Sequence, residues 1–232
     1  MQIAKNVIIF GETGAGKSSL INLIAGERVA ETSSKAVGCT FDSQCYKVKV
    51  NQGEYFIWDT AGLNEGIHGT VPGPAALASM KKLLRTLADG EGVSLLVYCF
   101  RGPRVRSVLL KNYKLFYSAI CRKKVPIVAV VTGLENESDM DRWWTENQMV
   151  FRKNRMFFHD HACVTTLGDG NITSDAFKTR YNDSQTKAQV LIQSSCRSKP
   201  WKLSSKNWIE ATLGDVRSMI LSNVIACDIT HD

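Results

Sequence analysis

The chain has 232 residues, of which 44% are hydrophobic and 22% are charged. This length can bury a sizeable core, and this balance excludes the disordered and fibrous classes of protein. The formal net charge is +7, but no recognisable nucleic-acid-reading motif accompanies it, so we expect no specific nucleic-acid partner.

The first part of the chain predicts a strand, a helix and a hairpin. Residues 4–10 (AKNVIIF) form an apolar run typical of a buried strand, and a helix is expected over 17–25. In residues 44–50 apolar side chains alternate with lysines, and the turn NQG leads directly into a second strand over 54–59. Alternation around a short glycine-containing turn predicts an antiparallel hairpin at the edge of a sheet.

The rest of the chain alternates between apolar strands and helical stretches. Strands are predicted over 93–100, 125–131 and 161–165, and helices over 74–88, 105–121, 138–151, 184–195 and 204–222. This alternation predicts an α/β fold of three layers, with helices on both faces of a mostly parallel six-stranded sheet that has one antiparallel edge strand. We expect a single domain over residues 1–232, with a surface insertion at about 168–204, where polar residues dominate.

The stretch FGETGAGKSS, residues 10–19, lies between the first strand and the first helix and fits G-x-x-x-x-G-K-S/T. Glycines in this pattern let backbone N–H groups surround a β-phosphate, the lysine reaches the β- and γ-phosphates, and the Ser18 hydroxyl can ligate Mg²⁺. We therefore predict a site for a nucleoside triphosphate and Mg²⁺, without a choice of base. Its residues are Gly11, Thr13, Gly14, Ala15, Gly16, Lys17, Ser18 and Ser19.

A second motif, WDTAGLNEG, ends the second strand of the hairpin. Asp59 lies 42 residues after Lys17, at a strand end where its carboxylate can hold Mg²⁺ through water. Gly62 stands where a backbone N–H can bond the γ-phosphate. Loss of that bond on hydrolysis would free the following segment, so the motif predicts a sensor of the γ-phosphate.

Phosphate loop, edge hairpin, DTAG and the later strands occur in the order of the Ras-like GTPase domain, which this chain resembles over residues 3 to about 166 and in its final helix. GETGAGKSSLINLI with DTAGL is similar to the septin, immune-associated nucleotide-binding and chloroplast import-receptor branch. The resemblance implies a P-loop GTPase fold, or G domain, that binds guanine nucleotide and hydrolyses GTP as a molecular switch. It also implies a homodimer across the nucleotide face, since this branch often pairs there.

The resemblance also implies a threonine that closes on Mg²⁺ and the γ-phosphate, between the first helix and the hairpin. Thr40 in AVGCTFD is our first choice and Thr32 the second. The bland alternative for Thr40 is a turn hydroxyl. Lys17, Thr40 and Gly62 are thus expected to act in hydrolysis, and Ser18, Thr40 and Asp59 to surround the metal.

Base recognition in such domains uses Asn/Thr-Lys-x-Asp after the fifth strand, where this chain has TGLE, Thr132 to Glu135. Gly133 replaces the lysine and Glu135 the aspartate. A carboxylate can accept both N1–H and N2–H₂ of guanine, which adenine does not offer, so Glu135 keeps the discriminating chemistry. The alternative is a helix-capping acid. A second base-contacting loop is expected around CVTTLGDG, with Thr165 and Thr166 as candidates by position.

Ras-like domains place a glutamine after DTAG to orient the attacking water, and here Leu63 has no group that can do so. Intrinsic hydrolysis is therefore expected to be slow or organised differently. His68 could orient water or act as a base, although it could equally be a solvated surface residue. Alternatively, a second subunit or partner could insert an arginine such as Arg101 or Arg104. A GTP-binding scaffold with negligible hydrolysis and a P-loop small-molecule kinase stay open as other functions.

Eight basic residues and no acid lie between Arg101 and Lys124, in a largely helical segment. This segment is either a solvated helix face or a contact surface for acidic partners or anionic lipid headgroups. The chain has no run of about 18 apolar residues and no recognisable secretory signal, so we expect a cytoplasmic protein whose membrane contact, if any, is peripheral. Its seven scattered cysteines form no C-x-x-C pair and are expected to be reduced thiols.

Overall fold

The computed structural model contains a six-stranded sheet with the order β2-β3-β1-β4-β5-β6. Its strands are β1 (Lys5–Phe10), β2 (Gln44–Val50), β3 (Gly53–Asp59), β4 (Leu95–Arg101), β5 (Ile127–Thr132) and β6 (Asp160–Cys163). Only β2 runs antiparallel to its neighbour, β3, and the other four pairings are parallel. The structure describes residues 5–30, 44–60, 82–83, 85–102, 107–167, 175–202 and 214.

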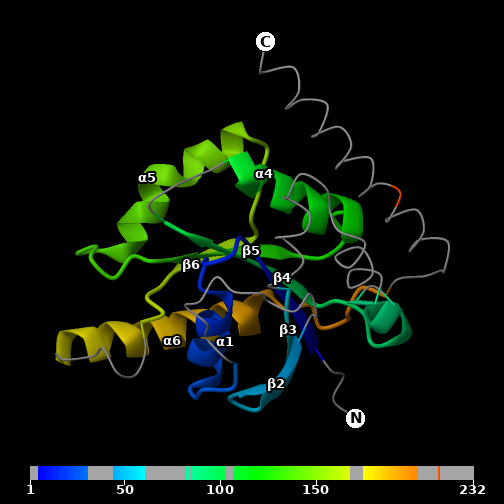
Figure 1. The fold of residues 1–232 in the computed structure, drawn as a ribbon, viewed down its shortest axis with the longest axis horizontal. Coiled ribbons are helices and arrows are strands. Elements are labelled where there is room, and N and C mark those ends of the chain that lie inside the picture. The colour runs from blue at the N-terminus through cyan, green and yellow to red at the C-terminus, as the bar shows by residue number, and fades with distance from the viewer. Residues whose placement is uncertain are drawn as a thin grey trace.

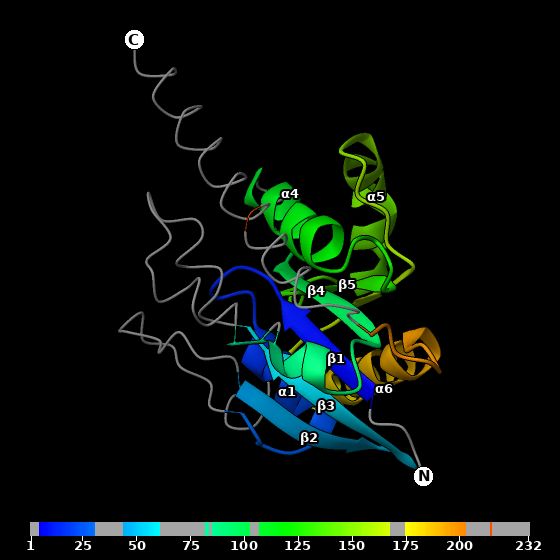
Figure 2. The same cartoon turned by 90° about the vertical axis from the view of Figure 1, so that its right-hand side faces the viewer.

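Helices cover both faces of this sheet, as Figures 1 and 2 show. One face carries α1 (Lys17–Ala25) and α6 (Asp175–Ser195), and the other carries α4 (Ser107–Tyr113), the π-helical segment η1 (Lys114–Ile120) and α5 (Met140–Lys153). Each face has its own buried cluster, one built around Leu20 and Ile57 and the other around Phe10 and Phe116. The predicted three-layer α/β fold is confirmed.

The central strands are buried on both faces because helices cover each side. Every residue of β5 is buried, and β4 is buried from Leu95 to Phe100, so only Arg101 at its end is exposed. The hairpin follows the predicted alternation, since Val48 and Val50 of β2 are buried while the lysines between and beside them are exposed. Continuous apolar runs therefore belong to strands that are covered on both faces, and the alternating run belongs to a strand with one exposed face.

Helix boundaries differ in detail from the prediction. The helix expected over 105–121 consists of α4 followed by η1. Of the helix expected over 74–88, the structure describes residues 82–83 and 85–88, which are helical and bury Leu83 and Leu87 against the sheet. The helix expected over 204–222 lies outside the described residues except for position 214.

Within residues 168–204, where we expected a surface insertion, the helix predicted over 184–195 is longer than expected. This helix, α6, begins at Asp175, runs for 21 residues and packs against α1 and β6. Its buried side chains recur at steps of three and four residues, at Ser184, Ala188, Leu191, Ile192 and Ser195. The polar composition belongs to the exposed face of an amphipathic helix that forms part of a layer of the fold.

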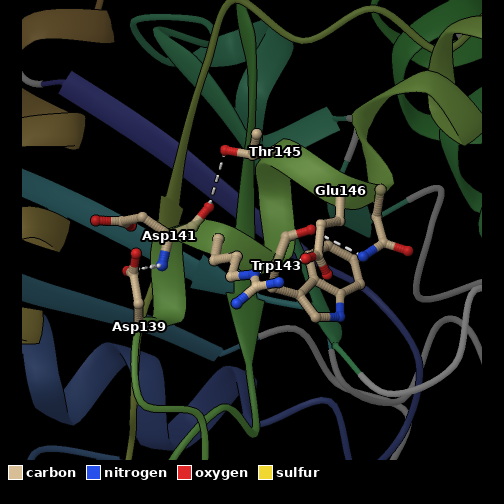
Figure 3. Close-up of polar contacts among 7 residues, drawn as sticks. Asp139, Asp141, Trp143, Thr145 and Glu146 are labelled. Carbon is tan, nitrogen blue, oxygen red and sulfur yellow. Dashed lines mark hydrogen bonds and ion pairs between the residues drawn. The ribbon is translucent and has the colours of Figure 1, made fainter.

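The loop from β5 to α5 ends in a capped helix start (Figure 3). The Asp139 carboxylate accepts a hydrogen bond from the backbone N–H of Asp141 at 3.0 Å. Farther along the first turns, the Thr145 hydroxyl donates to the Asp141 carbonyl, and Arg142 pairs with Glu146 at 2.7 Å. This cap fixes the end of the loop that carries Glu135. Among the helices that the structure describes, none combines the length and apolarity needed to cross a membrane.

Candidate functional site

The predicted phosphate loop follows β1 at the carboxyl end of the sheet and leads into α1. Gly11 lies so close to β4 that an added Cβ would be 1.8 Å from the Cys99 carbonyl oxygen. Gly14 and Gly16 have φ angles of 75° and 87°, in the left-handed region that glycine tolerates best. The three glycines therefore serve the path of the backbone, and Gly16 stands at the cap of α1 with no side chain over the helix start.

Lys17 is fixed across this loop. Its ammonium donates to the carbonyl oxygens of Gly11 at 3.0 Å and Glu12 at 2.8 Å, and only 5% of the residue is exposed. A buried ammonium needs such partners, because leaving it unpaired away from water is costly. The loop thus presents a positive charge together with the backbone N–H groups at the start of α1.

Ser18 and Asp59 join α1 to the end of β3. The Ser18 hydroxyl donates to Asp59 Oδ2 at 2.9 Å, and Asp59 is nearly buried, with 5% exposed. The next residue, Thr60, is anchored by its hydroxyl, which donates to the Ile9 carbonyl of β1 at 3.0 Å. Hydroxyl and carboxylate oxygens are the ligands that Mg²⁺ prefers, so these residues fit the predicted ion.

The phosphate loop is tied to β4 and β5 through one carbonyl. The Ala15 oxygen accepts hydrogen bonds from the Thr132 hydroxyl at 2.7 Å and from Cys99 Sγ at 3.2 Å. Burial raises the pKa of the Cys99 thiol to about 12, with nearby Lys17 opposing that rise, so the thiol keeps its proton. Thr132, which we predicted to bind nucleotide, directs its hydroxyl at the loop and supports it from beneath.

Glu135 follows β5 and is surrounded by two arginines. Its side chain is only 15% exposed and forms an ion pair with Arg101 at the end of β4, with 3.6 Å between Nη2 and Oε1. Arg180 of α6 donates to the backbone carbonyl oxygens of Glu135 at 2.9 Å and Glu137 at 2.8 Å. Sequence reasoning missed Arg180, because it lies in the segment that we expected to be an insertion. The three- and four-residue period of the buried positions of α6 was the signal that could have found it.

The loop after β6 brings one of its two candidate threonines to the phosphate loop. Thr165 is buried, its N–H donates to the Ser184 hydroxyl at 3.0 Å, and its own hydroxyl accepts from the Leu167 N–H. Thr166 Oγ1 lies 3.4 Å from where a Cβ on Gly16 would stand. Position therefore favours Thr166 over Thr165 as the side chain beside the loop.

The structure brings together Gly11, Gly16, Lys17, Ser18, Asp59 and Thr132 as one continuous group. Several predicted residues lie outside the described part of the chain, and their roles stay predictions. These are Thr32, Thr40, Gly62, Leu63, His68 and Arg104.

Comparison with known proteins gives matches over much of this chain. The family model described as 50S ribosome-binding GTPase matches residues 6–132. GTPase Der from Campylobacter curvus is 28% identical over 140 residues, which cover 60% of this chain and 28% of Der. GTPase Der from Campylobacter concisus is 27% identical over the same length, with the same coverage. The matched region thus spans 28% of the length of these curated relatives.

Solved structures share the fold. Era in complex with MgGDPNP and a segment of 16S ribosomal RNA has a TM-score of 0.59 and 17% identity, covering 89% of this chain and 61% of Era. Toc33 from Arabidopsis thaliana in complex with GDP and Mg²⁺ has a TM-score of 0.53 and 17% identity, covering 84% of this chain and 87% of Toc33. The six-stranded sheet with its helices is the fold of P-loop GTPase domains.

Proposed function

This chain belongs to the family described as 50S ribosome-binding GTPases, and from that premise we propose that it binds GTP with Mg²⁺ and hydrolyses it slowly as a molecular switch. The observation that carries the proposal is the group formed by Lys17, Ser18 and Asp59. Lys17 is fixed across the phosphate loop, and Ser18 is hydrogen-bonded to Asp59 at the end of β3.

In the proposed complex, the chain contributes mostly position and charge. Backbone N–H groups of residues 13–19 surround the phosphates, and Lys17 donates charge-assisted hydrogen bonds to the β- and γ-phosphate oxygens. Ser18 and Asp59 would hold Mg²⁺, which when bound neutralises charge on the phosphate oxygens. Glu135 accepts the N1–H and N2–H₂ of guanine, and Thr165 and Thr166 line the second base loop.

Hydrolysis is proposed to depend on the segment after Asp59. Thr40 and Gly62 would sense the γ-phosphate. His68 or an arginine from a partner would take over the role of the water-orienting glutamine, whose place Leu63 occupies. A homodimer across the nucleotide face is the arrangement that we propose for such assistance. Such a protein hydrolyses GTP slowly as a monomer and faster as a homodimer.

Two further functions are distinguishable from this one. A GTP-binding scaffold or assembly module with negligible hydrolysis is favoured by Leu63. A P-loop kinase that phosphorylates a small molecule is third, because DTAG and the edge hairpin are features of GTPase domains.

The branch and the partners are proposed from sequence motifs and from surface charge. The GETGAGKSSLINLI and DTAGL stretches favour the branch that includes the chloroplast import receptors, and Toc33 shares the fold. The curated relatives matched in sequence are bacterial Der proteins instead. Exposed lysines and arginines at Lys111, Lys114 and 122–124 support a peripheral contact with an acidic surface. We carry no RNA partner over from Era, and we propose a cytoplasmic location.

The test is single-turnover hydrolysis of GTP and of ATP with Mg²⁺, measured over a series of protein concentrations. A GTP rate that rises with concentration is expected for dimer assistance. Tight GTP binding without turnover would favour the scaffold, and preference for ATP would overturn the guanine assignment. Lys17→Ala should abolish turnover, whereas Lys111→Ala, which alters an exposed lysine of α4, serves as the matched control.

A further inference from the structure

Gly133 leaves a space after β5 that the side chain of Arg101 fills. A Cβ added to Gly133 would lie 2.7 Å from both Cγ and Nε of Arg101, which is too close for any real contact. The φ of Gly133 is 75°, so this position also favours glycine for its backbone. Arg101 pairs in register with Thr132 on the neighbouring strand, which brings its side chain over the start of the loop. The Arg101 side chain can therefore occupy this position because residue 133 has no side chain.

Arg101 reaches from this space to Glu135. The 3.6 Å between its Nη2 and Glu135 Oε1 is an ion-pair distance and too long for a hydrogen bond. The carboxylate oxygens therefore keep lone pairs for N–H donors while a positive charge restrains the side chain. The Arg101 side chain is 63% exposed and that of Glu135 only 15%, so the guanidinium lies on the outer side of the pair.

The backbone beneath Glu135 is fixed independently. Arg180 binds the carbonyl oxygens of Glu135 and Glu137, and Asp139 caps α5 where the loop ends (Figure 3). With the backbone anchored, the remaining freedom at this position is that of the glutamate side chain, which has more rotamers than aspartate. Among the residues that the structure describes, Arg101 forms the ion pair with this side chain.

We propose that Arg101 is a positioning residue for guanine recognition, which orients the Glu135 carboxylate from across the space that Gly133 leaves open. This inference rests on the proposed GTP binding. Orienting a carboxylate before the ligand arrives raises affinity for the ligand with matching donors, because less side-chain freedom is lost on binding. Arg101 thus supplies, from the neighbouring strand, the cation that Gly133 cannot.

The experiment is equilibrium titration of the full chain with GTP and with ATP, each with Mg²⁺. We expect Arg101→Ala to weaken GTP binding roughly fivefold to tenfold and to leave ATP binding unchanged, so the ratio of the two affinities falls. Arg101→Lys should recover only part of this loss. In a Glu135→Ala background, Arg101→Ala should change GTP affinity less than about twofold, because the pair acts as a unit.

Controls separate this inference from its premise. Arg152→Ala alters an exposed arginine at the far end of α5 and should leave both affinities unchanged. The positioning role would be overturned if Arg101→Ala weakened GTP binding and ATP binding equally. It would also be overturned if this variant changed the rate of hydrolysis and left GTP affinity unchanged. If the wild-type chain bound no GTP, the proposed function itself would fall. Gly133→Ala gives a second route, since its Cβ must displace Arg101 and should lower the GTP to ATP ratio in the same direction.

Discussion

Removing the hydroxyl of Thr132 tests how the phosphate loop is supported. Thr132→Val keeps the shape of the side chain and deletes the donor of the 2.7 Å hydrogen bond to the Ala15 carbonyl. Leaving a buried acceptor unsatisfied costs about 1–3 kcal/mol. Cys99 Sγ still donates to the same oxygen at 3.2 Å, and a thiol is a weak donor, so we expect a loss of about 1–2 kcal/mol in the free energy of unfolding.

The same change should loosen the loop around the phosphates and weaken GTP binding by roughly fivefold. Urea unfolding followed by tryptophan fluorescence measures the first effect, and titration with GTP and Mg²⁺ measures the second. Thr132→Ser is the matched control, because it keeps the hydroxyl and removes only a methyl group, and it should leave GTP affinity within about twofold of wild type. If Thr132→Val matched wild type in both measurements, the hydroxyl would not be what supports the loop.

Three other predictions address packing and pH. Gly11→Ala should lower the free energy of unfolding by about 3 kcal/mol or more in urea titrations, because its Cβ would lie 1.8 Å from the Cys99 carbonyl oxygen. Gly14→Ala is the control, because its Cβ would have no atom within 4 Å, and it should cost about 1 kcal/mol for its left-handed backbone. Equal costs would contradict the close approach. Leu191→Ala should cost about 2–5 kcal/mol in the same assay, while Val190→Ala, which is 55% exposed, should stay within about 0.5 kcal/mol; similar losses would refute the packing of α6. Burial lowers the pKa of His161, which stacks on Trp144 at 4.4 Å. The unfolded chain therefore binds more protons than the folded chain as the pH falls through about 6.5. The free energy of unfolding should decline there more in the wild type than in His161→Gln. Parallel curves of this free energy against pH for the two proteins, from about pH 7.5 to about pH 5.5, would disprove this effect of burial on His161.

The sheet and the phosphate loop could be predicted because their signals are local. β5 is apolar from Ile127 to Val131, since helices cover both faces of the sheet, and the loop is specified by glycines at positions that the backbone requires. The hairpin was equally clear, because alternation reports one buried face. Each of these features depends on residues that are close together in the sequence.

The predictions were incomplete for the extent of α6 and for contacts between residues far apart in the chain. In α6 the polar residues of the exposed face masked a regular buried stripe, so composition outweighed period in our prediction. Arg180 and Glu135 are 45 residues apart, and their contact exists only because α6 covers the sheet. The pairing of Arg101 with Glu135 likewise depends on the adjacency of β4 and β5. Sequence spacing could not indicate either contact.

We propose that the loop of residues 11–18 holds the phosphates of GTP while Glu135 selects guanine. The most direct measurement is equilibrium binding of GTP and ATP, with Mg²⁺, to the wild type and to Lys17→Ala. We predict that the wild type prefers GTP by at least about 100-fold and that Lys17→Ala loses at least about 100-fold in GTP affinity while remaining folded in urea titrations. Equal affinity for the two nucleotides, or GTP binding unchanged by loss of the lysine, would contradict the account.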